Sequence, residues 1–265
     1  MDSDGPDLAR VDLGAPGLAR VVDHLLGGAH SFAVDREAAD VLESEVPGIR
    51  RAVHQTRSFQ GRAVRYLLDQ GVRQFLDLGA GLPGVGSVHE VAAASGRPAR
   101  VVYVDIDPMA VAHARHMVRL VPNTAAVLSD LRSPALVFEH EEVRAVIDPD
   151  QPLGVLLTDV LPALPEPIGD VLDGYLDRMV AGSYLALAHP TSEGWPGAEG
   201  RTSETWAPVV LRTVAAVHAL WDRVDLVPPG VVPVGDWRPD HPVEEVRQES
   251  TVPVLAGLGR VRPEA

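Results

Sequence analysis

Short apolar segments alternate with segments of helical spacing over most of the chain, and this alternation restricts its fold more than any other feature. The first apolar segment, RQFLDLGAG (73–81), is followed by the helical segment SVHEVAAASG (87–96), and the same order then recurs. Strands that alternate with helices are typical of a parallel sheet with helices on both faces. The further predicted strands are 99–107, 124–130, 152–161, 182–191, 223–230 and 252–261, and the further predicted helices are 108–120, 133–147, 168–180 and 203–221, the last with Ser203 as its cap.

The final two predicted strands are joined in a different way. Between them lies the Pro-rich stretch PPGVVPVGDWRPDHPVEE, which has no helical pattern. A connection without a helix suits an antiparallel pair, because a parallel crossover needs a dozen or more residues. We therefore predict a Rossmann-like, doubly wound α/β fold whose sheet is mostly parallel, with about seven strands and an antiparallel last strand.

A helical region precedes the first strand. Residues 15–28, 35–46 and 49–71 have helical spacing, and Gly61 predicts a bend in the third of these helices. We predict two parts: an N-terminal helical segment, residues 1–71, acting as a lid, and a Rossmann-like domain over residues 72–265. Residues 1–14 read as a loose, acidic start.

Charge and missing residue types exclude several classes of function. The net charge is −14 with a pI of about 5.0, which disfavours nucleic acid as the main ligand. The chain contains no Cys and no Lys, which excludes thiolate sites, a P-loop lysine and a Schiff-base lysine. We expect no membrane span, because no apolar run is long enough. The acidic start predicts a cytoplasmic protein, and the oligomeric state is left open.

The loop after the first strand, Gly79-Ala80-Gly81-Leu82-Pro83-Gly84, matches the dinucleotide fingerprint G-x-G-x-x-G. Asp77 stands two residues before it, and a carboxylate there would repel a pyrophosphate but favour a cationic sulfonium ligand. Asp105, at the end of the next strand in YVDIDP, is placed to accept both ribose hydroxyls of an adenosine. Asp107 fits the cap of the helix that follows it.

Three motifs resemble those of class I S-adenosylmethionine-dependent methyltransferases: FLDLGAG, VVYVDIDPMAVAHAR and AVLSDLRSP. With DHLLGGAHSF and LPGVGSVHEVA, the chain resembles the actinobacterial S-adenosyl methyltransferase family DUF574 over about residues 15–262. The resemblance implies S-adenosylmethionine as cofactor and a small or medium-sized molecule as methyl acceptor. It also implies a set of cofactor-binding residues: Gly79, Ala80 and Gly81 at the methionine part, Asp105 at the ribose, Ile106 on the adenine, Asp130 and Leu131 at the adenine edge, Asp159 and Val160 near the methyl group, and His24, Gly28 and Arg57 above the cofactor.

Two alternative functions stay open at this point. The complete glycine fingerprint motivates an NAD-dependent oxidoreductase. After the fourth strand the family commonly has a Leu-His-Phe type sequence, but this chain has VLPAL, with Pro162 in place of a polar residue. That departure motivates a catalytically silent protein that binds S-adenosylmethionine for regulation.

Three sets of side chains are further candidates. Asp159 and His189 are the candidate catalytic residues, His189 because a strand-end imidazole can act as a base near neutral pH; its alternative is a hydrogen-bonded structural histidine. His113 and His116 have the i, i+3 spacing of a metal pair, but we predict no metal site because no third ligand is evident. The tryptophans Trp195, Trp206, Trp221 and Trp237 line either a substrate pocket or the core, and the Gly-rich loop around Trp195 has the length of a lid.

Overall fold

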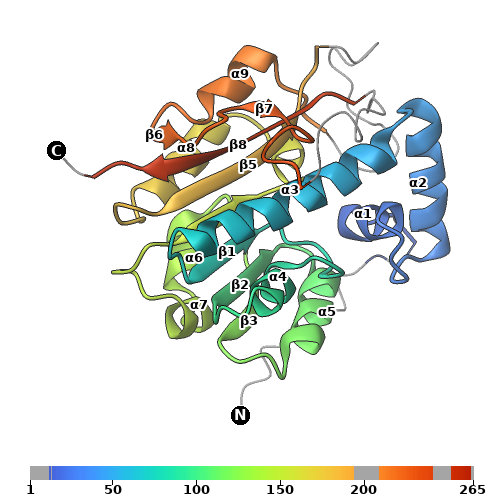
Figure 1. Cartoon of the computed structure of the whole chain (residues 1–265). Helices are drawn as coiled ribbons and strands as arrows, with labels where there is room; N and C mark the ends of the chain where they lie inside the picture. Colours follow the sequence, from blue (N-terminus) through green and yellow to red (C-terminus); the bar gives the residue numbers. More distant parts are fainter. Residues whose placement is uncertain (1–11, 13, 194–208, 241–251, 264–265) are drawn as a thin grey trace.

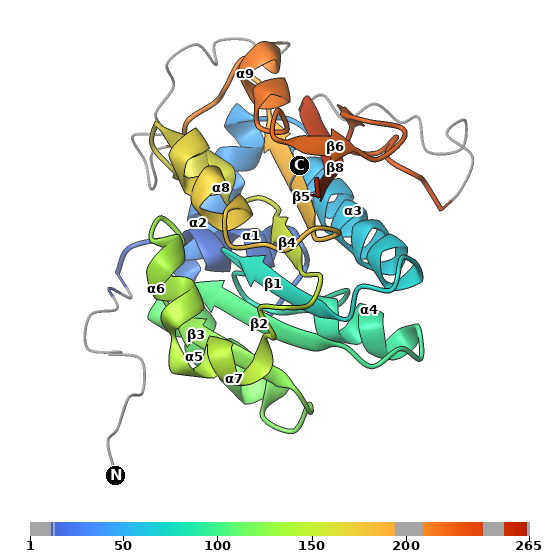
Figure 2. The same cartoon turned by 90° about the vertical axis from the view of Figure 1, so that its left-hand side faces the viewer.

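The computed structural model describes residue 12 and residues 14–193, 209–240 and 252–263. It forms a mixed α/β fold in which one sheet lies between two layers of helices (Figures 1 and 2). The bounds of the helices are α1 (Leu18–Leu25), α2 (Ala33–Glu45), α3 (Ile49–Asp69), α4 (Val88–Ala94), α5 (Pro108–Val118), α6 (Pro134–Glu139), α7 (Glu141–Val146), the 3-10 helix η2 (Leu161–Ala163), α8 (Ile168–Leu176) and α9 (Val214–Ala219). The bounds of the strands are β1 (Gln74–Leu78), β2 (Arg100–Asp105), β3 (Thr124–Leu128), β4 (Gly154–Leu157), β5 (Tyr184–Pro190), β6 (Val224–Leu226), β7 (Val232–Pro233) and β8 (Val254–Val261).

The sheet has the strand order β3-β2-β1-β4-β5-β8-β6, with β7 paired to β8. Strands β3, β2, β1, β4 and β5 are parallel, whereas β8 runs antiparallel to β5 and to β6. The prediction of a doubly wound, mostly parallel sheet with an antiparallel last strand is thus confirmed. The direction of winding reverses between β1 and β4, which in open α/β sheets is the point where ligands bind.

Alternation along the strands builds two separate cores. In β1, Phe75 joins the cluster under α3, α4 and α5, while Leu76 and Leu78 join the cluster under α6, α7, α8 and α9. Successive strand side chains point to opposite faces, so each buried strand supplies both clusters. Asp77 consequently lies on the α3 face of the sheet, at the end of β1.

The N-terminal helices divide between the core and a satellite. Helix α3 crosses one face of the sheet, and α1 and α2 lie at one end of α3 (Figure 1). Phe59, Val64 and Leu67 of α3 are fully buried in the sheet's core. Helices α1 and α2 instead share a small separate cluster with α3, formed by Val21, Leu25, Ala39 and Val53.

Four local predictions differ from the structure. Helix α3 continues unbroken through Gly61, which is buried where α4 packs on it. The predicted helix 133–147 is two helices, because His140 leaves the helical conformation and caps α7 through its Nδ1, which accepts from the Glu142 N–H. Helix α9 begins at Val214 and is capped by Thr213, so residues 209–213 are not helical. Strand β7 lies in the Pro-rich stretch that was predicted to be a loop.

Several sequence features lie outside the described residues. These are Ser203, Trp195, Trp206, the loop around Trp195 and most of the loose start. Within the described residues, no helix combines the length and apolar character needed to cross a membrane.

Candidate functional site

A cavity of about 430 Å³ lies at the carboxyl ends of β1 and β4, where the winding of the sheet reverses. We call it the switch-point cavity. It brings together most of the predicted site residues. They come from α3 and from the ends of four parallel strands and the loops after them, so no single stretch of sequence forms the site. The predicted residues that line it are Arg57, Gly79, Ala80, Gly81, Asp105, Ile106, Asp130, Leu131, Asp159 and Val160. His24, Gly28 and His189 are not among its lining residues.

The backbone of the loop after β1 favours glycine at two positions, and close packing requires it at one of them. Gly79 and Gly81 both have left-handed backbone conformations, with φ of 68° and 62°. The Val160 side chain occupies the place that a Cβ on Gly79 would take, with Cγ2 only 2.1 Å from it. No other residue type therefore fits at Gly79, and the loop after β4 packs directly on the glycine loop.

The third glycine of the fingerprint has no such role. Gly84 lacks a left-handed backbone, and among the described residues a Cβ added there meets no atom within 4 Å. Helix α4 begins later, at Val88. In a dinucleotide site this glycine allows close packing of the helix on the strand. The letter-for-letter match to G-x-G-x-x-G therefore does not reproduce the dinucleotide geometry.

Asp105 connects the end of β2 to the glycine loop. Its Oδ2 accepts a hydrogen bond from the Gly81 N–H at 2.7 Å, and its Oδ1 accepts from the Asp107 N–H at 2.8 Å. Burial raises the pKa of Asp105, and these backbone donors oppose the increase. Ile106, beside it, leaves 63% of its surface exposed in the cavity wall.

Asp107 caps α5 as predicted: its Oδ1 accepts from the Met109 N–H at 2.8 Å, and Pro108 follows it at the first helical position. The two aspartates of this segment are thus used in different ways.

At the next strand end, Asp130 is already paired. Arg132 donates from Nε to Asp130 Oδ2 at 2.9 Å, and its backbone N–H donates to Oδ1 at 2.9 Å. This pairing with Arg132 lowers the pKa of Asp130. The Leu131 backbone is held by α8, because its carbonyl accepts a hydrogen bond from the Tyr175 hydroxyl at 2.9 Å. The Asp130–Arg132 pair gives the cavity a polar rim whose charges cancel.

The opposite end of the cavity holds a short hydrogen-bonded chain. Gln60 of α3 donates from Nε2 to Asp77 Oδ2 at 2.9 Å, and its Oε1 accepts from Arg57 Nη1 at 3.2 Å. Burial raises the pKa of Asp77 to about 6, against the opposing effects of Arg57 and Gln60. Arg57 and Gln60 are three residues apart on one helix face, which brings both side chains to the same part of the site.

Asp159 completes this end of the cavity. It follows β4 in a left-handed conformation, with φ of 64°, which is uncommon for a residue with a side chain. Burial raises its pKa to about 7, and this increase is opposed by Arg57 and by the neighbouring Thr56 hydroxyl. Two carboxylates, Asp77 and Asp159, therefore share one guanidinium, that of Arg57.

His189 has the structural role that was its alternative. It is fully buried, its Nδ1 donates to the Pro190 carbonyl, and its Nε2 accepts from Arg212 Nη1 at 2.7 Å. Burial lowers the pKa of His189 to about 4, and Arg212 acts in the same direction. Both ring nitrogens are occupied and the ring lies outside the switch-point cavity. The prediction of His189 as a candidate base therefore has no support in this geometry.

Helix α1 brings Asp23 to the cavity and not His24, and Gly28 in the turn after the helix does not line it either. Asp23 Oδ2 accepts from the His30 N–H at 2.9 Å. Its carboxylate fills the space beside Gly28, where a Cβ would lie 2.1 Å from Oδ1. Gly28 thus makes room for Asp23, while the His24 ring faces Ser31 at 3.4 Å.

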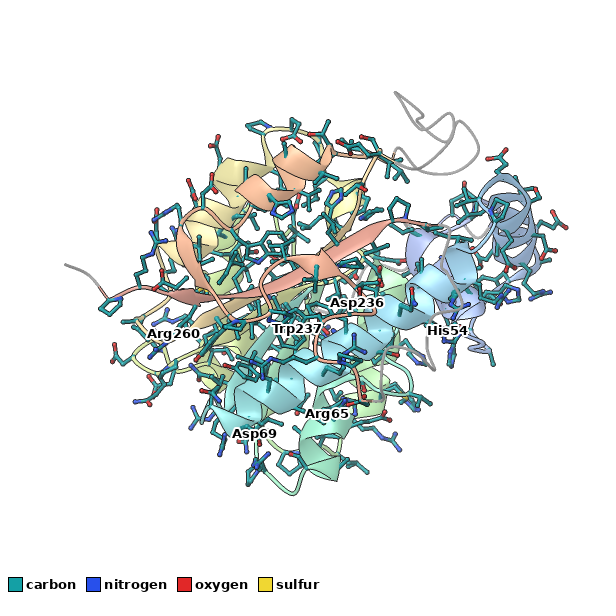
Figure 3. The ribbon with its side chains drawn as sticks, turned by 45° about the horizontal axis from the view of Figure 1, so that its top comes forward. His54, Arg65, Asp69, Asp236, Trp237 and Arg260 are labelled. Atoms are coloured by element: carbon teal, nitrogen blue, oxygen red, sulfur yellow. The ribbon has the colours of Figure 1, made fainter. Side chains whose placement is uncertain are left out.

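The remaining candidates are structural in the described part of the chain. His113 packs on His30 with ring centroids 4.0 Å apart, and among described residues no group of three or more His, Asp or Glu side chains could hold a metal ion. Trp221 and Trp237 are buried in the core. Figure 3 labels Trp237 beside α3, where its ring meets that of Phe59 edge to face at 5.3 Å.

Sequence reasoning missed several polar residues of the site, among them Asp23, Thr56, Gln60 and Arg132. Gln60 and Thr56 carry a usable signal, since both lie within one turn of Arg57 on a predicted helix. Arg132 follows Asp130 closely enough to pair with it. Asp23 had no signal separating it from His24, because the rotation of α1 depends on tertiary packing.

Comparison with known proteins identifies related chains. The family model described as S-adenosyl methyltransferase matches residues 5–262. No curated protein matches the chain. A protein named as a methyltransferase, from Thermobifida fusca YX, is 37% identical with a TM-score of 0.89, and the match covers 95% of this chain and 97% of that one. A DUF574 family protein from Streptomyces avermitilis MA-4680 is 29% identical with a TM-score of 0.88, over 95% of this chain and 100% of that one.

A more distant structure shares the fold. Magnesium protoporphyrin IX methyltransferase from Synechocystis PCC 6803, solved with bound S-adenosylhomocysteine, is 15% identical with a TM-score of 0.54. The match covers 91% of this chain and 93% of that one. These comparisons agree with the resemblance drawn from the sequence motifs, and they support neither the oxidoreductase nor the silent alternative.

Proposed function

The chain belongs to the S-adenosyl methyltransferase family, and from this premise we propose how the switch-point cavity binds the cofactor and the methyl acceptor. By family and fold the protein is an S-adenosylmethionine-dependent methyltransferase. The cofactor supplies a methyl group made electrophilic by a sulfonium. The chain's own residues have to hold the cofactor, orient the acceptor for in-line attack and exclude water.

One observation carries the proposal for the binding mode: the two ends of the cavity have different chemistry. At one end Asp105, fixed by Gly81 and Asp107, is suited to accept from ribose hydroxyls, with Ile106 as an apolar surface for the adenine. At the other end Arg57, Asp77 and Asp159 offer one cation and two carboxylates. That set is complementary to an amino-acid group with a carboxylate and an ammonium.

The individual roles follow from these positions. Arg57 binds the cofactor carboxylate, and the glycine loop lies along the methionine part. Asp130 and Leu131 border the adenine. Asp159 and Val160 lie at the methyl group, and the apolar residues Leu18 and Val22 of α1, with Leu26 directly after it, cover the cavity as a lid.

The acceptor in this proposal is a small or medium-sized molecule. The cavity measures about 430 Å³ and is covered by α1, so the space beside the cofactor suits a compact ligand. Asp159 is the candidate catalytic residue, since a carboxyl group whose pKa is about 7 can take a proton from an acceptor near neutral pH. An acceptor that carries no proton on the reacting atom needs no base.

The location and origin of the protein belong to the same proposal. S-adenosylmethionine is made and used inside cells, which supports a cytoplasmic location, and the two most similar structures reported above come from actinobacterial organisms. Cell fractionation followed by immunodetection tests the location.

Calorimetry tests the cofactor assignment. We expect S-adenosylmethionine to bind to the purified protein and NAD not to bind at equal concentration, because Asp77 disfavours a pyrophosphate beside the glycine loop. Arg57→Ala should lose most of the affinity. NAD binding without S-adenosylmethionine binding would overturn the proposal. Transfer of radiolabelled methyl groups to the ultrafiltrate of a cell extract, compared with its macromolecular fraction, tests the size of the acceptor.

A further inference from the structure

The two carboxylates and one guanidinium at the glycine end of the switch-point cavity form a compact charged group. Arg57 and Gln60 come from α3, Asp77 from the end of β1 and Asp159 from the loop after β4. Gln60 links Asp77 to Arg57 through hydrogen bonds of 2.9 and 3.2 Å. Thr56, on the same helix, lies beside Asp159 and acts to lower its pKa, while its hydroxyl donates to the Ala52 carbonyl at 3.0 Å. With all three groups ionised, this end of the cavity carries a charge of −1.

The negative charge at this end of the cavity should interact differently with S-adenosylmethionine, the cofactor of the proposed function, and with S-adenosylhomocysteine, its product. The amino-acid end of S-adenosylmethionine is neutral overall, since it has one ammonium and one carboxylate, and the sulfonium adds one positive charge. After methyl transfer the sulfur is a neutral thioether in S-adenosylhomocysteine. When Arg57 pairs with the ligand carboxylate and one aspartate pairs with the ammonium, the second aspartate faces a ligand cation, the sulfonium, only in the cofactor complex.

We propose that Asp159 is a specificity-determining residue that favours the sulfonium cofactor over its thioether product. The proposal rests on the proposed function, because it takes S-adenosylmethionine to occupy the switch-point cavity. Asp159 is assigned the role in preference to Asp77, because Gln60 holds the Asp77 carboxylate in a fully buried position. Asp159 remains partly exposed in the cavity.

The position of Asp159 places it beside the reacting group. The next residue, Val160, packs where a Cβ on Gly79 would be, so the Asp159 backbone is fixed against the glycine loop. Its left-handed conformation is unfavourable for a residue with a side chain, and such positions are maintained where the surrounding structure holds them, often at functional sites. A carboxylate fixed in this way interacts with a sulfonium without rearrangement.

The groups that face Asp159 determine how its charge responds to pH. From α3 these are Arg57 and Thr56, which favour the ionised form. Asp77 at the end of β1 shares Arg57, while Asp105 at the end of β2 and Asp23 of α1 are the acidic groups on neighbouring walls of the cavity. Burial outweighs Arg57 and holds the pKa of Asp159 near 7. A sulfonium should therefore displace a proton from this group near neutral pH, whereas a thioether should not.

Calorimetric titration with both ligands tests the inference. The dissociation constants of S-adenosylmethionine and S-adenosylhomocysteine are compared at about pH 5.5 and about pH 8.5, which lie on either side of the raised pKa values of Asp77 and Asp159. For the wild type, the preference for S-adenosylmethionine should increase roughly tenfold from the lower to the higher pH, which corresponds to about 1.4 kcal/mol. In Asp159→Asn this change with pH should disappear and the preference should be lost.

A matched variant controls for the general loss of negative charge. Asp130→Asn removes an acid from the same cavity, but one whose charge Arg132 already balances. This variant should change the affinity for both ligands alike and keep the dependence of their ratio on pH. A second measurement needs no variant. At about pH 6.5, the wild type should release more protons on binding S-adenosylmethionine than on binding S-adenosylhomocysteine. Calorimetry in buffers of different ionisation enthalpy measures this proton release.

Each outcome separates this inference from the proposed function. Absence of binding by both ligands would overturn the proposed function itself. Binding of both ligands with equal proton release, or with a ratio that neither pH nor Asp159→Asn changes, would overturn the inference and leave the cofactor assignment intact. Loss of the preference in Asp77→Asn but not in Asp159→Asn would overturn the inference as well, because it would show that Asp77 and not Asp159 has this role.

Discussion

Asp105 and Asp107 lie two residues apart, and their different partners predict different consequences of substitution. Asp105→Ala should weaken S-adenosylmethionine binding by about 1.5–3 kcal/mol, roughly 10- to 150-fold, because it removes charge-assisted hydrogen bonds to the ribose. It also frees the Gly81 N–H, which Asp105 now fixes. Asp107→Ala should instead cost about 1 kcal/mol of stability through loss of the α5 cap, with a smaller effect on affinity. Calorimetry and urea unfolding of both variants measure the contrast, and equal losses of affinity would contradict it.

Asp159 predicts how stability without ligand depends on pH. Its pKa is raised from 3.8 to about 7 in the folded protein, so the folded state binds more protons than the unfolded state between these values. The stability contributed by this group is therefore complete below about pH 4 and is lost as the pH increases to about 7. Asp159→Asn should remove this loss, so that above pH 7 it is more stable than the wild type by on the order of 1 kcal/mol.

Urea unfolding across the pH range measures this effect as a difference between variant and wild type. Asp150→Asn, which changes an exposed aspartate in a turn, is the control and should follow the wild type at every pH. A difference between Asp159→Asn and wild type that stays constant from pH 4 to pH 8 would contradict the assigned pKa.

Residues at strand ends could be predicted from the sequence, and residues on helices far less well. Asp77 and Asp105 lie at the ends of apolar strands and Asp159 follows one, and the parallel order of the strands brings these ends to one edge of the sheet. His189 also ends a strand, but β5 lies two places from β1, and Arg212 binds its ring. His24 was predicted in place of Asp23 because the sequence does not define how α1 is rotated over the cavity.

At the scale of elements, the loop between β4 and α8 depends on one buried side chain from a distant segment. Arg212 is 4% exposed and donates to the Leu161 carbonyl at 3.1 Å and to the Leu164 carbonyl at 3.0 Å. It also donates to Glu166 Oε1 at 2.6 Å and to His189. Leu164 lines the switch-point cavity. The segment at Arg212 thus fixes one wall of a site that it does not touch.

Arg212→Gln should destabilise the protein by roughly 2–4 kcal/mol, because buried carbonyls lose their donors. It should also raise the pKa of His189, since the guanidinium now disfavours the charged imidazole. Denaturant unfolding measures the first effect, and NMR titration of the imidazole signals measures the second. Arg223→Gln, at an exposed arginine that pairs with Asp173 and Asp177, should cost less than about 1 kcal/mol. An unchanged His189 pKa in Arg212→Gln would contradict the hydrogen bond between them.

The type of an element could be predicted where its apolar pattern extends over many residues. The predicted helix boundaries were wrong where a capping residue ends or delays the helix within such a pattern. The strands and the long helix α3 follow directly from apolar spacing. In contrast, the helical pattern of 133–147 gave no sign that His140 would end one helix and cap the next. Likewise, helical spacing continues through residues 209–213, but Arg212 is held by contacts in the core and the helix starts only at Val214.

For the whole molecule, the packing assigns α3 to the sheet and leaves α1 and α2 as a smaller unit. Besides its buried apolar face, α3 carries Arg62, which donates to the Trp237 carbonyl and the Val234 carbonyl, each at 2.7 Å. These contacts connect α3 to the C-terminal part of the chain. Helices α1 and α2 meet α3 through the small cluster around Val21 and Val53. A boundary after residue 71 would therefore separate α3 from the core it covers.

Two fragments test this division. Residues 72–265 lack α3, so one face of the sheet around Phe75 and Leu156 loses its cover, and this fragment should not fold cooperatively. Residues 48–265 keep α3 with Gly48 at its start and lose most of the satellite cluster together with Val46 of the main core, so this fragment should fold with lower stability. It should nevertheless bind S-adenosylhomocysteine at least about tenfold more weakly than the full chain, because Leu18, Val22 and Leu26 no longer cover the cavity. Near-ultraviolet circular dichroism, urea unfolding and calorimetry give the readouts. Cooperative unfolding of 72–265 would make α3 dispensable for the fold, and full affinity in 48–265 would show that α1 and α2 are packing elements and not a lid.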